Sequence, residues 1–556
     1  MFRQASRRIA MIAAALGATA LSAEGAGDGA RRAPLVSAGA CLLPGGDGSK
    51  RPAGGGGPVL LDGLGFAGIE ADSADREVRA WFAQGIRLIY AFDEVEAVRS
   101  FRKAQQLDPN CALCFFGEAW ARGPTINLQP RTDELVLARA AARRAAALSG
   151  RLSARDRILV EAMAIRTADG PAFGNAAYAD RMEAAARLMP EDDTLSIMAA
   201  DARMILSRGR MQPGNPSQQL LERVLRRSPN HGGAIHYYIH LTDWIDRQEL
   251  AVPYAERLGA IAPSASHLIH MPSHSFYGVG RYRDAAAVNV AAIATDRRFV
   301  QRARPVDSDY RTGLLRHNMH FAIESALARG DGATALAVSD QYRDTFLARR
   351  ATSSARLLGS ATWYARGLHG EIGAVLATAE PGNALEKALR HYARGEALAR
   401  AGDAAAVRAE AAAIAALRAG TDAPSLGPGG TPLAEVMQHV LEGRAAMLAG
   451  NFRAAARAYR RAMDRQLAAL PGADPPLFWY SVRRSLAAAT LARGDARGAR
   501  AQLRASLEHW PNDPLALYAL SLAERRLGRG AEAERALGAA RAGWAGEVTA
   551  IPLTRI

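Results

Sequence analysis

Residues 81–109, WFAQGIRLIYAFDEVEAVRSFRKAQQLDP, decide how this chain folds. Small and aromatic residues recur in this stretch at spacings that let two helices pack closely. Pro109 ends the second helix because proline cannot continue the backbone hydrogen bonding. The residues that carry the pattern are Trp81, Gly85, Ala97, Phe101, Ala104 and Pro109. The stretch therefore predicts one helical hairpin.

Copies of this hairpin follow along the chain at an interval of 34 residues. Pro229 and Pro263 are one interval apart, and so are the turn residues Asp246 and Gly280. Near the C-terminus the set Gly494, Ala499 and Leu503 recurs as Gly528, Ala533 and Leu537. A fixed period of this length is typical of helical solenoids, in which each hairpin buries its apolar face against the next.

The pattern resembles that of the tetratricopeptide repeat superfamily over roughly residues 75–545. We therefore expect an all-α fold, a solenoid of helix-turn-helix repeats that follows a disordered leader. We expect N-terminal repeats over 71–230, histidine-rich repeats over 231–345 and C-terminal repeats over 346–556. In this superfamily the first helix of each repeat lines a concave groove. The resemblance implies that residues repeated on that helix meet a ligand.

Seven of the twelve histidines lie between His236 and His320, within the histidine-rich repeats. A step of four residues occurs there three times, in His236 with His240, His270 with His274, and His320 with Glu324. Two more histidines, His267 and His317, each precede a pair by three residues. The four-residue step places both side chains on one face of a helix, and neutral imidazole binds zinc, copper, iron or nickel. We interpret all of these residues as candidate ligands of one or two transition-metal ions.

Two other interpretations of the histidines stay open. In one, the groove holds no metal and binds a carboxylate or phosphate ligand through histidines and arginines. In the other, the histidines form a hydrogen-bonded structural network. Because the candidate ligands outnumber the needs of one ion, some of them are also candidates for orienting ligands or transferring protons. Asp243 and Tyr277, one repeat apart, are candidates for orienting the ligands or for contact with a substrate.

The segment from His267 to His274, HLIHMPSH, is followed by Gly280-Arg-Tyr282. It resembles a group of exported bacterial tetratricopeptide proteins of unassigned function. The resemblance implies a histidine near Glu94 and a glutamate near Asp243. The chain departs from the group at both places, so Glu94 itself is the candidate groove residue of the first repeat.

Cys111 and Cys114 lie one helical turn apart. In an oxidising compartment such a pair forms a structural disulfide, which is the interpretation we favour. Contact with a metal and redox chemistry are the alternatives, because a helix N-terminus stabilises thiolates.

The N-terminus is typical of an export signal. Three arginines precede an apolar run over residues 9–20, and small residues follow through Ala23. Residues 1–23 are therefore predicted to be a signal peptide of the general secretory or twin-arginine type, and 24–70 a disordered, glycine-rich leader. No later stretch is apolar enough to span a membrane. We expect a periplasmic or secreted protein.

The net charge of +15 comes almost entirely from arginines that are interspersed with acidic residues. This mixture indicates a solvated helical surface. The basic residues also lack the interleaved aromatic residues of a single-strand binding platform. Nucleic acid is therefore not the expected partner.

Together these features predict an exported repeat protein whose groove carries a multi-histidine transition-metal site. Export, histidine ligands and the lack of clustered thiolates favour copper, with zinc and iron next. If the protein is an enzyme, it is a metal-dependent oxidoreductase or hydrolase. The alternative is a scaffold without catalytic activity that binds a peptide or protein partner on the concave face.

Overall fold

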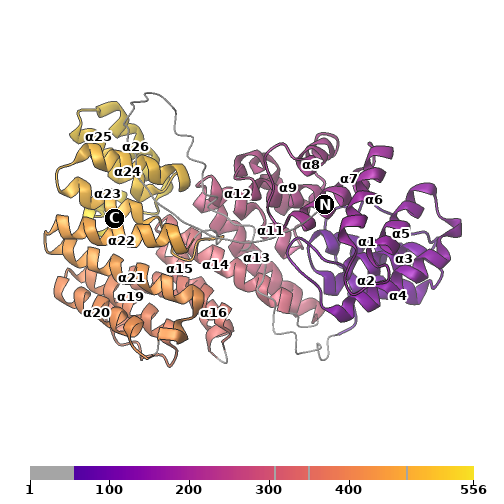
Figure 1. Ribbon diagram of the computed structural model, residues 1–556, viewed down its shortest axis with the longest axis horizontal. Coiled ribbons are helices and arrows are strands. Elements are labelled where there is room, and N and C mark those ends of the chain that lie inside the picture. The colour runs from indigo at the N-terminus through magenta and orange to yellow at the C-terminus, as the bar shows by residue number, and fades with distance from the viewer. Residues whose placement is uncertain (1–55, 306–308, 349–350, 422, 471–473) are drawn as a thin grey trace, which may run out of the picture. The chain divides into compact units, whose positions relative to one another are not determined.

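The computed structural model describes residues 56–305, 309–348, 351–421, 423–470 and 474–556. The predicted signal peptide and most of the predicted leader lie outside these ranges. Among the described residues all regular structure is helical, as Figure 1 shows, and the predicted all-α fold is confirmed. None of the helices in these ranges is long and apolar enough to cross a bilayer.

Successive helices pack against each other along the chain and form a solenoid of helical hairpins. The N-terminal helices are α1 (Arg76–Tyr90), α2 (Glu94–Leu107), α3 (Ala112–Ala121), α4 (Thr132–Leu148), α5 (Ala154–Arg166), α6 (Asn175–Leu188), α7 (Asp193–Ser207) and α8 (Pro216–Arg227). The histidine-rich region contains α9 (Gly232–Trp244), α10 (Val252–Ile261), α11 (Ser266–His270), α12 (Pro272–Gly278), α13 (Tyr282–Ala303), α14 (Asp309–Ala328) and α15 (Gly332–Tyr342).

The C-terminal helices continue the same arrangement. They are α16 (Ser353–Leu358), α17 (Ser360–His369), α18 (Ile372–Leu376), α19 (Ala384–Ala401), α20 (Ala404–Ala419), α21 (Gly427–Leu448), α22 (Phe452–Ala469), α23 (Val482–Ala492), α24 (Ala496–His509), α25 (Pro514–Arg526) and α26 (Gly530–Gly543).

The first hairpin packs as its sequence predicts. Trp81, Ala97 and Phe101 are buried, and the Phe101 ring fills the space beside two glycines. A Cβ atom at Gly85 would lie 2.5 Å from Cζ of Phe101, and one at Gly117 would lie 2.3 Å from Cε1 of the same ring. The ring therefore occupies the volume that a larger residue at either glycine would need.

Residues 56–70, the last part of the leader predicted to be disordered, are instead ordered: they have no regular secondary structure but pack against the helices. The Leu61 N–H donates to Oε1 of Gln84 at 2.7 Å, and the Ser264 N–H donates to the Gly63 carbonyl at 2.9 Å. Leu64 and Ile69 are buried. This segment therefore connects α1 to the loop before α11.

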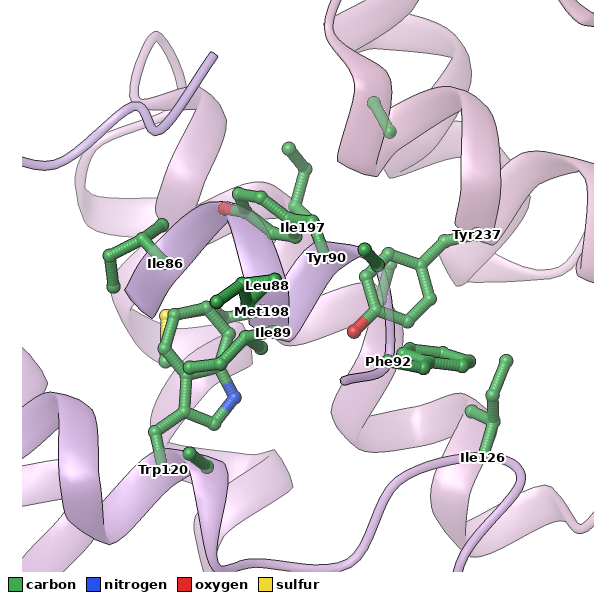
Figure 2. Close-up of a cluster of buried hydrophobic side chains, with 14 of the residues drawn as sticks. Ile86, Leu88, Ile89, Tyr90, Phe92, Trp120, Ile126, Ile197, Met198 and Tyr237 are labelled. Carbon is green, nitrogen blue, oxygen red and sulfur yellow. The ribbon is translucent and has the colours of Figure 1, made fainter. Parts of the chain in front are cut away.

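The α1–α2 turn lies within the first of three hydrophobic cores. Figure 2 shows this part of the core, with the ring of Phe92 beside that of Tyr237. Because Tyr237 directly follows a predicted ligand histidine, the first repeat packs against the start of the histidine-rich region.

Candidate metal centre

Three buried histidines, His236, His240 and His267, form a group that we call the first triad. The first two are one turn apart on α9, and His267 comes from α11. Nε2 of His236 lies 3.1 Å from Nε2 of His240 and 3.0 Å from Nε2 of His267. Three ring nitrogens thus converge on one point from two helices.

A second triad consists of His270, His274 and His317, all buried. The proline at 272 separates α11 from α12 between the first two, and His317 is contributed by α14. Nε2 of His270 lies 3.0 Å from Nε2 of His274. The ring of His317 is centred 4.8 Å from that of His270. Within each triad the ligand atoms lie within 4.8 Å of one another.

Backbone and side-chain acceptors bind the Nδ1 atoms of three of these rings. Nδ1 of His236 lies 2.6 Å from the Tyr90 carbonyl oxygen, and Nδ1 of His274 is hydrogen-bonded to the Asp474 carboxylate. Nδ1 of His270 lies 2.6 Å from Oδ1 of Asn289, whose own amide N–H donates to a backbone carbonyl. In each case the partner is an acceptor, so Nδ1 carries the proton and donates. The proton on Nδ1 leaves a lone pair on Nε2, which is the arrangement of metal-binding histidines.

Burial keeps the imidazoles neutral. It lowers the pKa of His236 to about 3, and it lowers the pKa of His240, His267, His270 and His317 well below the usual value. Neighbouring imidazoles lower these pKa values further, because two protonated rings would repel each other. Neutral imidazole is the form that binds a metal ion.

The two triads are neighbours. The rings of His240 and His274 are centred 6.0 Å apart, and those of His267 and His270 are centred 5.8 Å apart. Each triad also has an aromatic cover. Phe92 lies 4.3 Å from the ring of His236, measured between centroids, and contacts the other two rings of the first triad.

Phe321 packs against all three rings of the second triad, with centroid distances between 4.9 and 5.4 Å. The two groups are therefore distinct clusters of nitrogen ligands, each closed on one side by a phenyl ring.

The third predicted pair, His320 and Glu324, is buried on α14 but belongs to neither triad. Nε2 of His320 lies 3.7 Å from Oε1 of Glu324. Burial lowers the pKa of His320 to about 3 and raises the pKa of Glu324. Neither side chain has a hydrogen-bond partner among the described residues.

The other predicted site residues take different places. Asp243 lies beside the second triad, with Oδ2 3.8 Å from Nδ1 of His274, and burial raises its pKa to about 7. Tyr277 is buried next to Phe321.

Glu94 is buried at the start of α2 and belongs to none of the histidine or acidic groups among the described residues that could hold an ion. Cys111 and Cys114 are joined by a disulfide at the start of α3.

Asp474 is a candidate site residue that the sequence did not indicate. With Asp243 and His274 it forms a third group of potential ligands. It lies in the connection between α22 and α23, outside the histidine-rich repeats, and no local pattern marks it. No local pattern marks Phe92 or Asn289 either, so the sequence did not indicate that they contact the histidines.

No family model and no curated protein matches this chain. Among solved structures, the human IFIT1 dimer with m7Gppp-AAAA is similar with 14% identity and a TM-score of 0.29, over 85% of this chain and 91% of that one. Naa15/Naa10 bound to HypK-THB has 12% identity and a TM-score of 0.21, over 84% of this chain and 89% of that one. Similarities this low concern helical architecture alone.

Proposed function

We propose that this chain is an exported tetratricopeptide-type protein whose two histidine triads bind a pair of transition-metal ions. Copper is favoured over zinc and iron, because the ligands are neutral imidazoles and no thiolates cluster with them. Three ligands for each ion leave a coordination position open. Such a centre can activate water or dioxygen, so the proposed chemistry is that of a metal-dependent hydrolase or oxidoreductase.

The contact between His270 and His274 carries the proposal. Both Nδ1 atoms donate to acceptors, so two Nε2 lone pairs face each other at 3.0 Å. Lone pairs at this distance repel unless a cation lies between them. Burial disfavours a proton in that place, since it lowers the pKa of His270. A metal ion satisfies both nitrogens at once.

The first triad leads to the same conclusion. The Nδ1–H of His236 donates to the Tyr90 carbonyl, and its Nε2 then faces two further imidazole nitrogens. One lone pair cannot accept hydrogen bonds from both of them. Two ligands at 2.0–2.1 Å from a tetrahedral ion are about 3.3 Å apart, so small shifts of the rings accommodate a metal.

Metal analysis of the full chain, purified from the compartment to which it is exported, tests the proposal. We expect about two ions per chain and a melting temperature that falls on chelation. A His439→Ala variant is the matched control, because this histidine lies on α21 and bonds to Glu442. Protein that stays free of metal after reconstitution with copper, zinc and iron, with an unchanged melting temperature, would overturn it.

A second candidate function, a scaffold for an acidic partner, is favoured by the arginines on α20–α23. A hollow of about 460 Å³ on α20–α22 is bordered by Arg408, Arg457 and Arg461. A neighbouring hollow of about 250 Å³ shares Arg457 and adds Arg453, Arg460 and Arg493. Clustered guanidinium groups recognise carboxylates.

Binding of a glutamate-rich peptide, measured by fluorescence anisotropy, tests this role. Arg457→Glu should weaken binding at least about tenfold at low salt, whereas Arg541→Glu, an exposed control on α26, should not. Equal affinities of the two variants would remove the scaffold role at this surface. Metal content is expected to stay the same in both.

A further inference from the structure

A small pocket lies directly beside the first triad. Its volume is about 40 Å³, enough for a few non-hydrogen atoms. The residues that line it belong to the segment before α1, the end of α1 and the α1–α2 turn, the start of α11 with the loop before it, and the helices α13 and α14. Most of the lining is apolar: Leu61, Leu64, Leu88, Ala91, Phe92, Ala265, Phe299 and Leu314. The polar lining includes His267 of the first triad.

Phe92 forms the wall between this pocket and the other two histidines of the triad, His236 and His240. It lines the pocket, and its ring also packs on all three imidazoles. Its backbone is left-handed, with φ 54°. Asp246 and Gly280, at the turns of later repeats, have the same left-handed conformation.

A bulky side chain is unfavourable in this conformation, and such strain persists where the surrounding structure enforces it, often at functional sites. The surrounding structure therefore holds the Phe92 ring in this place although phenylalanine disfavours the backbone conformation that this requires.

His267 is a polar side chain in the lining of this pocket. The residue is 3% exposed, and its Nδ1 has no hydrogen-bond partner among the described residues. Its Nε2 is directed at His236, so with a metal bound there the ring proton is on Nδ1. A buried N–H needs an acceptor. A ligand in the pocket with an accepting atom would supply it.

Charge restricts what enters. Asp93 and Asp296 line the pocket together with Arg311, and burial raises the pKa of both carboxyl groups. The rest of the lining is apolar, and apolar side chains cannot offset the free energy that an ion loses when it leaves water. The pocket is thus suited to a neutral molecule.

We propose that this pocket binds a small uncharged molecule next to the first metal ion, with Phe92 controlling its passage. The ligand class is a neutral species of the size of dioxygen with an atom that accepts a hydrogen bond from His267. This inference rests on the proposed metal function. It specifies that the small molecule approaches the first metal ion from the side of Phe92 and His267.

Xenon probes the pocket without any metal. Crystals of the metal-free full chain under xenon pressure should show an atom between Leu64 and Phe92, as expected for an apolar cavity of this kind. Leu64→Trp fills the pocket and should abolish this site. Leu188→Trp is the matched control, since it makes the same change at an exposed position of α6. Absence of xenon from the wild-type pocket would overturn the proposal.

Carbon monoxide then probes access to the metal. In the copper(I)-loaded chain, the rate of carbon monoxide binding, followed by its infrared stretch, should fall at least about tenfold in Leu64→Trp. Phe92→Gly, which suits the left-handed backbone and removes the wall, should bind faster than wild type. Metal content is measured in every variant, so loss of the metal is distinguished from loss of access. Unchanged rates in both variants at full metal occupancy would overturn the proposal.

Discussion

Asp474 and His274 are 200 residues apart in the sequence, and the Nδ1–H of the histidine donates to the carboxylate of the aspartate in the buried centre. The hydrogen bond fixes the ring so that its Nε2 faces Nε2 of His270 within the second triad. It also joins the connection between α22 and α23 to α12. The C-terminal part of the chain thus contacts a cluster whose six candidate ligand histidines all lie within the histidine-rich region.

Replacing Asp474 by alanine should weaken metal binding at the second triad. Its loss leaves the Nδ1–H of His274 without this acceptor, and loss of such a partner typically lowers affinity about 10–100-fold. Competition with a chelator of known affinity measures the change. Asp464→Ala, at an exposed position of α22, is the control and should behave as wild type. Equal affinities of the two variants would contradict a role for Asp474 in orienting the ring.

The two triads should be separable by mutation. His236→Ala removes the central ligand of the first triad, and His270→Ala removes one from the second. Each variant should retain about one ion per chain, and the double variant none. Metal analysis with a parallel circular dichroism spectrum checks both binding and folding. If either single variant loses both ions while still folded, the six histidines form one shared site.

Asp201 should make stability depend on pH. Burial raises the pKa of this carboxyl group from 3.8 to about 7, against the opposing effects of Arg166 and Tyr237. The group is therefore protonated in the folded chain at pH values where the unfolded chain has lost the proton. Its contribution to stability is complete below about pH 4 and is lost as the pH rises towards 7, by up to about 4 kcal/mol.

Asp201→Asn should remove this dependence. Between pH 5 and pH 7.5 the free energy of unfolding of the variant should increase relative to that of wild type, as measured by urea denaturation, because only the wild type loses stability as the pH rises. Asp464→Asn supplies the reference for a solvated carboxyl group. A constant difference across this range would show that the folded-state pKa is not raised.

Two glycines of the solenoid should respond oppositely to alanine. At Gly85 a Cβ atom would lie 2.5 Å from the buried Phe101 ring, so Gly85→Ala should destabilise the chain by about 1–3 kcal/mol. At Gly538, within α26, a Cβ atom meets nothing within 4 Å. Gly538→Ala should stabilise by about 0.5–1 kcal/mol, because alanine loses less backbone entropy in a helix. Melting temperatures of both variants, shifted in opposite directions, would bear this out.

The sequence alone determined the helical hairpins and the placement of His236 and His240 on one face of α9. Both follow from local periodicity, because residues four apart share a helical face wherever the helix lies, and a 34-residue period repeats that face. Tertiary structure alone decided which histidines form each triad and left His320 and Glu324 outside both. It also decided that Asp474 and Phe92 join the centre. Such contacts depend on how distant helices pack, and no spacing along the chain encodes that packing.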